Sequence, residues 1–205
     1  VYKRQVLTIT LSGSLPERVI DDPFQDLLEP ESPKISTEMI RSNLKKAASD
    51  DRIKGIILEL KSISASWATL QEVHRNLLKF KESGKFIYAY TDDMGMDEAA
   101  YYVATAADKI MSPPASFFEF DGFYVQGEFY KNLFDKVGVK PEITRYGKYK
   151  SAIEPYIRTS FSNESREQLN AILSNNMDEF LGAISESRNI PTSTLNNFLD
   201  DAPDM

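Results

Sequence analysis

Hydrophobic positions follow two alternating patterns along the first 110 residues. Runs rich in β-branched and aromatic residues at 6–11, 53–60 and 86–90 predict buried strands. Between these runs, apolar side chains recur every three or four positions over residues 37–48 and 67–82, which predicts two amphipathic helices. Such alternation of strands and helices favours an α/β fold with a mostly parallel sheet.

Local signals mark the ends of these helices and the elements that follow. Ser36 or Thr37 is placed to cap the first helix, and Gly84 ends the second because glycine adopts the left-handed conformation easily. Residues 16–34 contain four prolines and many acids, which predicts a loop. The remaining pattern predicts helices over 97–107, 128–137, 163–187 (capped by Ser162) and 191–199, and strands over 109–112, 119–125 and 142–146.

Composition excludes several classes of function. The chain has 205 residues, of which 41% are hydrophobic, and its 24 basic residues against 31 acidic ones give a net charge of -7. A negative chain argues against nucleic acid as a partner, because phosphate binding needs a basic face. Without cysteine and with one histidine, the chain offers no thiolate or multi-histidine metal site, so we expect no metal and no cofactor. No apolar run in this sequence reaches the roughly 18 residues of a membrane span, and we expect no signal peptide within it.

One lysine stands among uncharged neighbours. Lys150 follows Tyr149 and precedes Ser151, Ala152 and Ile153. An exposed lysine has a pKa of roughly 10.4 and is almost fully protonated, whereas burial can lower the pKa by several units. A buried Lys150 would therefore be a candidate general base. The alternative is an ordinary surface lysine, which is the more frequent case.

The segment GKYKSAIEPYIR resembles the lysine segment of the signal peptide peptidase A family, which are membrane-anchored serine/lysine peptidases of family S49. Residues 51–60, 83–90, 100–110 and 121–136 resemble further segments of that family in the same order, so the resemblance covers most of residues 51–173. It implies a ClpP/crotonase-like spiral of ββα units with a C-terminal helical extension. We expect residues 1–155 to form an N-terminal repeat, and residues 156–205 to form a helical linker toward a second repeat of a longer, membrane-anchored polypeptide.

The nucleophilic serine of that family has no counterpart here. The matching place reads Glu98-Ala99-Ala100-Tyr101-Tyr102, and the loop expected at residues 61–66 lacks the glycine pair of an oxyanion hole. These departures resemble the first half of the long, duplicated form, in which the first repeat supplies the lysine and the second supplies the serine. The resemblance thus implies that Lys150 takes a proton from a serine outside this chain, and that the chain alone is inactive.

Neighbouring residues are candidates for supporting roles. Ser151 is expected to hydrogen-bond the neutral amine, and Tyr149 with Ile153 to exclude water from it. Lys148 is the rival base, because residues two apart on an extended segment point the same way. The resemblance favours Lys150, which immediately precedes Ser-Ala-x-Glu-Pro, and leaves Lys148 to raise the local positive charge. Glu154-Pro155 is expected to end the strand before it, and His74 to lie at the edge of the core.

The function implied by the resemblance is an endopeptidase that degrades cleaved, hydrophobic signal peptides. It would work at the bacterial inner membrane, on the extracytoplasmic side, as a homo-oligomer completed by the second repeat. Two alternatives stay open. One is a catalytically inactive ClpP-like domain that serves assembly or peptide binding. The other is a crotonase-like acyl-CoA enzyme, which is disfavoured because the chain shows neither a glycine-rich oxyanion loop nor a basic patch for the CoA phosphates.

Overall fold

The computed structural model describes residues 4–19, 35–92 and 95–200. Most of the loop predicted at residues 16–34 lies outside these ranges. The chain divides into two compact units. The first, here called the sheet unit, contains the residues up to Asp121 and those from Leu181 onward. The second, here called the lysine unit, contains Gly122–Phe180. These units are defined by contacts, so the predicted repeat boundary after residue 155 stays a prediction.

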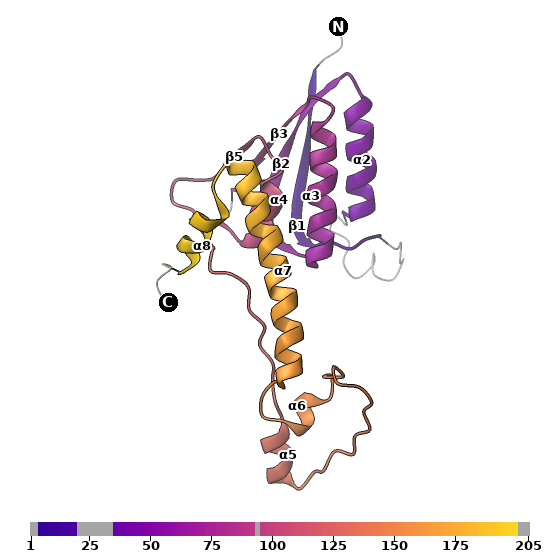
Figure 1. Cartoon of the computed structure of the whole chain (residues 1–205). Helices are drawn as coiled ribbons and strands as arrows, with labels where there is room; N and C mark the ends of the chain where they lie inside the picture. Colours follow the sequence, from indigo (N-terminus) through magenta and orange to yellow (C-terminus); the bar gives the residue numbers. More distant parts are fainter. Residues whose placement is uncertain (1–3, 20–34, 93–94, 201–205) are drawn as a thin grey trace. The chain divides into compact units, whose positions relative to one another are not determined.

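A parallel sheet forms the centre of the sheet unit (Figure 1). Its strand order is β1-β2-β3-β5, and every pairing is parallel. The predicted α/β fold with a mostly parallel sheet is therefore confirmed. The four strands are β1 (Gln5–Ser14), β2 (Ile53–Ser64), β3 (Phe86–Tyr90) and β5 (Lys109–Met111).

Helices α2 (Thr37–Ser49) and α3 (Trp67–Lys81) pack against each other beside this sheet (Figure 1). Leu44 of α2 and Leu77 of α3 are buried, as the helical spacing of apolar residues predicted. A shorter helix, α4 (Glu98–Ala104), contacts α3 and β2. Burial of these apolar faces stabilises the unit by roughly 25 cal/mol for each Å² removed from water.

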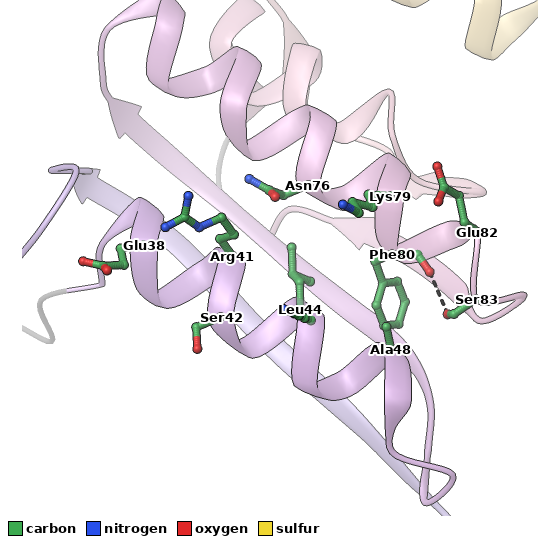
Figure 2. Close-up of a pocket in the computed structure, with 11 residues that line it drawn as sticks. Glu38, Arg41, Ser42, Leu44, Ala48, Asn76, Lys79, Phe80, Glu82 and Ser83 are labelled. Carbon is green, nitrogen blue, oxygen red and sulfur yellow. Dashed lines mark hydrogen bonds between the residues drawn. The ribbon is translucent and has the colours of Figure 1, made fainter.

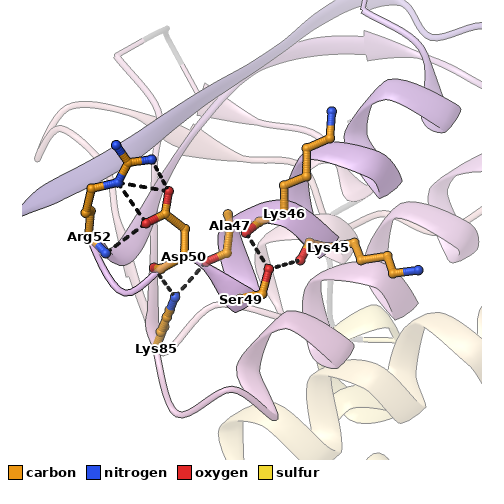
Figure 3. Close-up of polar contacts among 7 residues, drawn as sticks. All are labelled: Lys45, Lys46, Ala47, Ser49, Asp50, Arg52 and Lys85. Atoms are coloured by element: carbon orange, nitrogen blue, oxygen red, sulfur yellow. Dashed lines mark hydrogen bonds and ion pairs between the residues drawn. The ribbon is translucent and has the colours of Figure 1, made fainter.

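The predicted helix ends are confirmed. The Ser36 hydroxyl accepts a hydrogen bond from the Met39 N–H at 3.3 Å, and Gly84, three residues after the end of α3, adopts a φ of 76°. The end of α2 is held by additional hydrogen bonds, which are drawn in Figure 3. Lys85 Nζ donates to the carbonyl oxygens of Ala47 at 2.6 Å and Asp50 at 2.7 Å. This lysine thus satisfies carbonyl groups that a helix end leaves without intrahelical partners.

Two predictions in the sheet unit are wrong. Residues 61–64 are not a loop but continue β2, because Ile63 is buried and the strand still pairs with β1 as far as Ser14. Residues 119–125 form no strand. Instead, a short strand β6 (Phe117–Phe118) pairs in parallel with β4 (Gly95–Met96). The alternating aromatics beyond it lack a neighbouring strand, and Gly122 turns the backbone with a φ of 91°.

The lysine unit contains α5 (Lys131–Val137), α6 (Glu154–Ile157) and residues 163–180 of α7 (Asn163–Arg188). Gly138 ends α5 in the left-handed conformation, as expected. The strand predicted at 142–146 is absent, because no strand lies beside this segment among the described residues. Glu154-Pro155 opens α6 rather than ending a strand, and proline suits the first turn of a helix. Helix α7 and α8 (Thr192–Asp200) confirm the predicted C-terminal helical extension.

Candidate active site

Lys150 lies on an open cleft of about 450 Å³ within the lysine unit. A turn at residues 147–149 precedes it, and Gly147 makes this turn possible with a φ of 109°. The Lys150 side chain is exposed, and among the described residues no hydrogen bond or ion pair engages its amine. The other residues that line the cleft are Thr144, Arg145, Tyr146, Tyr149, Ser151, Ala152 and Ile153.

The expected burial of Lys150 is not provided by its neighbours in sequence. Tyr149 is itself 42% exposed, and Ile153 is only partly buried. Among the contacts of the described residues, the Ser151 hydroxyl makes no hydrogen bond to the amine, whereas its carbonyl oxygen accepts the N–H of Glu154 at 2.9 Å. The cleft therefore presents the amine but does not enclose it.

The structure separates the two candidate lysines. Residues 148 and 149 form a turn rather than an extended segment, so Lys148 and Lys150 do not share the strand geometry that made them equivalent. Lys148 Nζ lies 5.1 Å from the centre of the Tyr149 ring. A hydrogen bond with Tyr149, together with the charge of Glu167, raises the pKa of Lys148. A raised pKa makes Lys148 less suited to act as a general base.

A buried carboxylate, which the sequence analysis missed, fastens the segment after Lys150. Glu154 is only 2% exposed, and its Oε2 accepts the backbone N–H of Ser162 and the hydroxyl of Ser165, both at 2.9 Å. The Ser162 hydroxyl in turn accepts the N–H of Ser165 at 3.1 Å, which confirms the predicted cap of α7. Burial, the largest influence, opposes ionisation of Glu154, but the hydrogen bonds from Ser162 and Ser165 prevail and lower its pKa.

The position that the resemblance assigns to the serine holds a second buried carboxylate. Glu98 begins α4, is 9% exposed, and accepts the N–H of Asp121 at 3.2 Å. Asp97 caps the helix by accepting the Ala100 N–H at 2.7 Å, as expected of an acid at a helix start. A cleft of about 280 Å³ in the sheet unit lies beside these residues. Its lining contains Lys61, Ser62, Gly95, Met96, Asp97, Ala100, Phe117 and Glu119, and no serine at the start of α4.

Other parts of the described chain offer less chemistry. A cleft of about 750 Å³ lies between α2 and α3, and Figure 2 shows Leu44 pointing into it amid charged side chains. None of the candidate residues from the sequence lines it. His74 is buried, where its Nε2 lies 2.9 Å from the Thr105 hydroxyl and its ring stacks on Tyr102. Over residues 4–19, 35–92 and 95–200, no cluster of side chains is suited to holding a metal ion.

Of the helices that the structure describes, none combines the length and the apolar character needed to cross a bilayer.

Comparison with known proteins assigns this chain to a family. The profile of the family described as "Peptidase family S49" matches residues 79–203. The chain is 34% identical over 200 residues to the chloroplastic serine protease SPPA of Arabidopsis thaliana, an alignment that covers 98% of this chain and 28% of the relative. It is 32% identical over 158 residues to Protease 4 of Haemophilus influenzae, covering 77% of this chain and 25% of the relative. The chain thus spans about a quarter of the length of these curated relatives.

Among solved structures, a mutant of a membrane-bound stomatin-specific protease aligns with 96% of this chain and 70% of its own, with a TM-score of 0.50 and 10% identity. At this identity the likeness concerns the fold alone, and it agrees with the expected ClpP/crotonase-like architecture.

Proposed function

Because this chain belongs to peptidase family S49, we propose that it supplies the lysine general base of a serine/lysine peptidase, with Lys150 in that role. The observation that carries the proposal is the contrast between two lysines. Among the described residues Lys150 presents an amine without a hydrogen-bond or ion-pair partner on an open cleft, whereas the Lys148 amine lies over the Tyr149 ring and has a raised pKa. A general base has to be accessible and able to lose its charge.

The proposed reaction uses a serine from outside this chain. A neutral Lys150 amine takes the proton of that serine hydroxyl, and the serine oxygen bonds to the carbonyl carbon of the substrate peptide. The resulting ammonium returns the proton to the leaving amine as the carbon–nitrogen bond breaks. Water, deprotonated by the same amine, then hydrolyses the acyl-enzyme. The buried carboxylate of Glu98 at the place of the serine supports an external nucleophile.

A second repeat of the same polypeptide is the proposed source of both the serine and the missing burial. Lysine is easily deprotonated only where water is excluded, because desolvation disfavours its charged form. The exposure of Lys150 and of Tyr149 on the cleft supports a partner surface that covers them. We further propose a homo-oligomeric protease that degrades hydrophobic, cleaved signal peptides at the bacterial inner membrane, on its extracytoplasmic side. The exposed tyrosines of the cleft support an apolar substrate.

Substitution in the longer protein that contains both repeats tests the role of Lys150. We expect Lys150→Ala to lower kcat for an apolar reporter peptide by a factor of about 10²–10⁴, the usual contribution of a general base. Lys148→Ala is the matched control, and it should leave kcat within about threefold, since general acid–base assistance is not lost. The chain alone should not hydrolyse the peptide.

Two outcomes would contradict this function. Full activity of Lys150→Ala would favour the alternative of a catalytically inactive domain for assembly or peptide binding. Hydrolysis by the chain alone would place the nucleophile within it.

A further inference from the structure

Glu154 connects three segments around the lysine of the cleft. Its Oε2 accepts hydrogen bonds from Ser162 N–H and Ser165 Oγ at the start of α7. Its Oε1 lies 4.0 Å from Nη1 of Arg145, in the segment before the lysine turn. Its own N–H donates to the carbonyl oxygen of Ser151, the residue that follows Lys150. The side chain of one buried residue thus ties the segment before the lysine to the start of α7, and its backbone N–H holds the residue that follows the lysine.

The peptide unit beside Glu154 extends this attachment. The carbonyl oxygen of Pro155 accepts the N–H of Tyr130 at 2.7 Å, which joins α6 to the start of α5. The N–H of Arg158 returns to the Glu154 carbonyl at 2.9 Å and closes the single turn of α6. The backbone of Glu154 is therefore fixed on both sides, only four residues from Lys150.

The charges that face Glu154 favour its ionised form. Arg145 lies beside one carboxylate oxygen, and Arg158 adds a positive charge from α6. The start of α7 adds the positive end of a long helix dipole, and Ser162 and Ser165 are uncharged donors from that helix. Hydrogen bonds from these serines lower the pKa of Glu154 in spite of its burial. An ionised carboxylate is the stronger acceptor, so the anchor is tightest when Glu154 is charged.

We propose that Glu154 is a positioning residue for Lys150. Glu154 holds the lysine turn against the start of α7, so that the Lys150 amine keeps one position on the cleft. The proposal rests on the role of Lys150 proposed above. It assigns to the acid of Ser-Ala-Ile-Glu-Pro a task distinct from proton transfer, since its oxygens face Ser162, Ser165 and Arg145. A displacement of about 1 Å is enough to cost on the order of 10²-fold in rate when a catalytic group is held in place by its surroundings.

Graded substitutions separate positioning from a general loss of folding. Glu154→Ala removes the acceptor for both donors, whereas Glu154→Gln keeps an oxygen for them but turns a donor amide toward Arg145. Ser165→Ala removes one donor and leaves the carboxylate in place. Glu142→Ala is the matched control, because Glu142 is an exposed glutamate of the same unit for which no hydrogen bond or ion pair is found among the described residues.

The first measurement is hydrogen exchange of the chain and needs no activity. In Glu154→Ala, the amides of residues 151–166 should exchange at least tenfold faster, while those of β2 and α3 exchange at the wild-type rate. Ser165→Ala should show a smaller acceleration in the same residues, and Glu142→Ala none. Unchanged exchange at 151–166 in Glu154→Ala would overturn the inference and leave the proposed role of Lys150 untouched.

The second measurement is the pH profile of kcat/KM in the longer protein, taken well below its melting temperature. We expect Glu154→Ala to lower kcat by about 10- to 100-fold, the cost of a misplaced group, with KM within about threefold. Its activity should also rise only at higher pH than in the wild type, and Glu154→Gln should lie between the two. Loss of activity without movement of the pH profile would reduce Glu154 to a structural residue. Full activity of Lys150→Ala would instead remove the proposed function on which the inference rests.

Discussion

The sheet unit and the lysine unit are stabilised by opposite means. The sheet unit has an apolar core made of strands and helices, in which Ile56, Leu58 and Phe80 are at most 2% exposed. Within residues 122–180 the buried side chains are Phe180 and three polar ones, Glu154, Ser162 and Ser165. Apolar side chains of this unit are instead left more than half exposed, namely Tyr124, Leu133, Val137, Tyr146 and Ile172.

The same contrast holds for one lysine in each unit. Lys85 of the sheet unit donates to two carbonyl oxygens at the end of α2 (Figure 3). Lys150 of the lysine unit makes no such contact among the described residues. The apolar core of the sheet unit holds the Lys85 amine in a structural contact, whereas the lysine unit leaves the Lys150 amine without one among the described residues. The comparison links the weak core of the lysine unit to its proposed chemistry.

The largest expected effect tests whether the core really lies in one unit. Leu58→Ala should lower the free energy of unfolding of the sheet unit by about 3 kcal/mol, because it leaves a cavity in a packed interior. Leu133→Ala is the matched substitution in α5, where the side chain is 53% exposed, and it should change that energy by less than about 0.5 kcal/mol. Denaturation in urea measures both. Equal losses would mean that the lysine unit has a core of its own.

A smaller effect tests the structural lysine. Lys85→Met keeps most of the side-chain length but leaves the carbonyl groups of Ala47 and Asp50 without their donor. We expect a loss of about 1–3 kcal/mol, as for hydrogen bonds from a charged group. Lys79→Met, an exposed lysine on α3, is the control and should cost less than about 0.5 kcal/mol. If the two variants have the same melting temperature, the hydrogen bonds from Lys85 to the end of α2 do not stabilise the fold.

Local signals were enough to predict much of the sheet unit and helices α5 and α7 of the lysine unit, but not the segment around Lys150. Ser36, Gly84 and the spacing of apolar residues in α3 act within a few residues, so they are readable from the chain. The strands predicted at 119–125 and 142–146 failed because alternation cannot supply a neighbouring strand. Tyr149 and Ile153 were expected to exclude water from Lys150 but do not enclose it, since flanking apolar residues do not surround a side chain by themselves.

Glu154 shows what the sequence conceals at the candidate site. Its partners Ser162 and Ser165 are eight and eleven residues away, and only the turn of α6 brings them to its carboxylate. An acid followed by proline is an ordinary helix-start pattern, so its burial was not foreseeable. The sequence could have suggested a contact, because two serines frame the predicted start of α7, but it gave no reason to choose this acid.

The smallest expected effect compares two carboxylates under acid. Hydrogen bonds from Arg52 lower the pKa of Asp50 in the sheet unit to about 2, and those from Ser162 and Ser165 lower the pKa of the buried Glu154 in the lysine unit. A lowered pKa means that each contribution to stability is complete above the ordinary carboxyl range, near 4, and is lost as the pH falls through the folded value.

Amide resonances of Ser162 and Arg166, followed by NMR from pH 7 to pH 3, should therefore broaden below the ordinary glutamate pKa of 4.5. Amides near the half-buried Asp50 should stay unchanged over this range, because the pKa of Asp50 is about 2. In Glu154→Gln the α7 resonances should start less dispersed but stay constant over this range, because no proton is taken up there. An identical acid transition in the wild type and in Glu154→Gln would mean that the charge of Glu154 does not anchor α7. The lysine unit would then not be stabilised by a buried carboxylate, as the comparison of the two units claims.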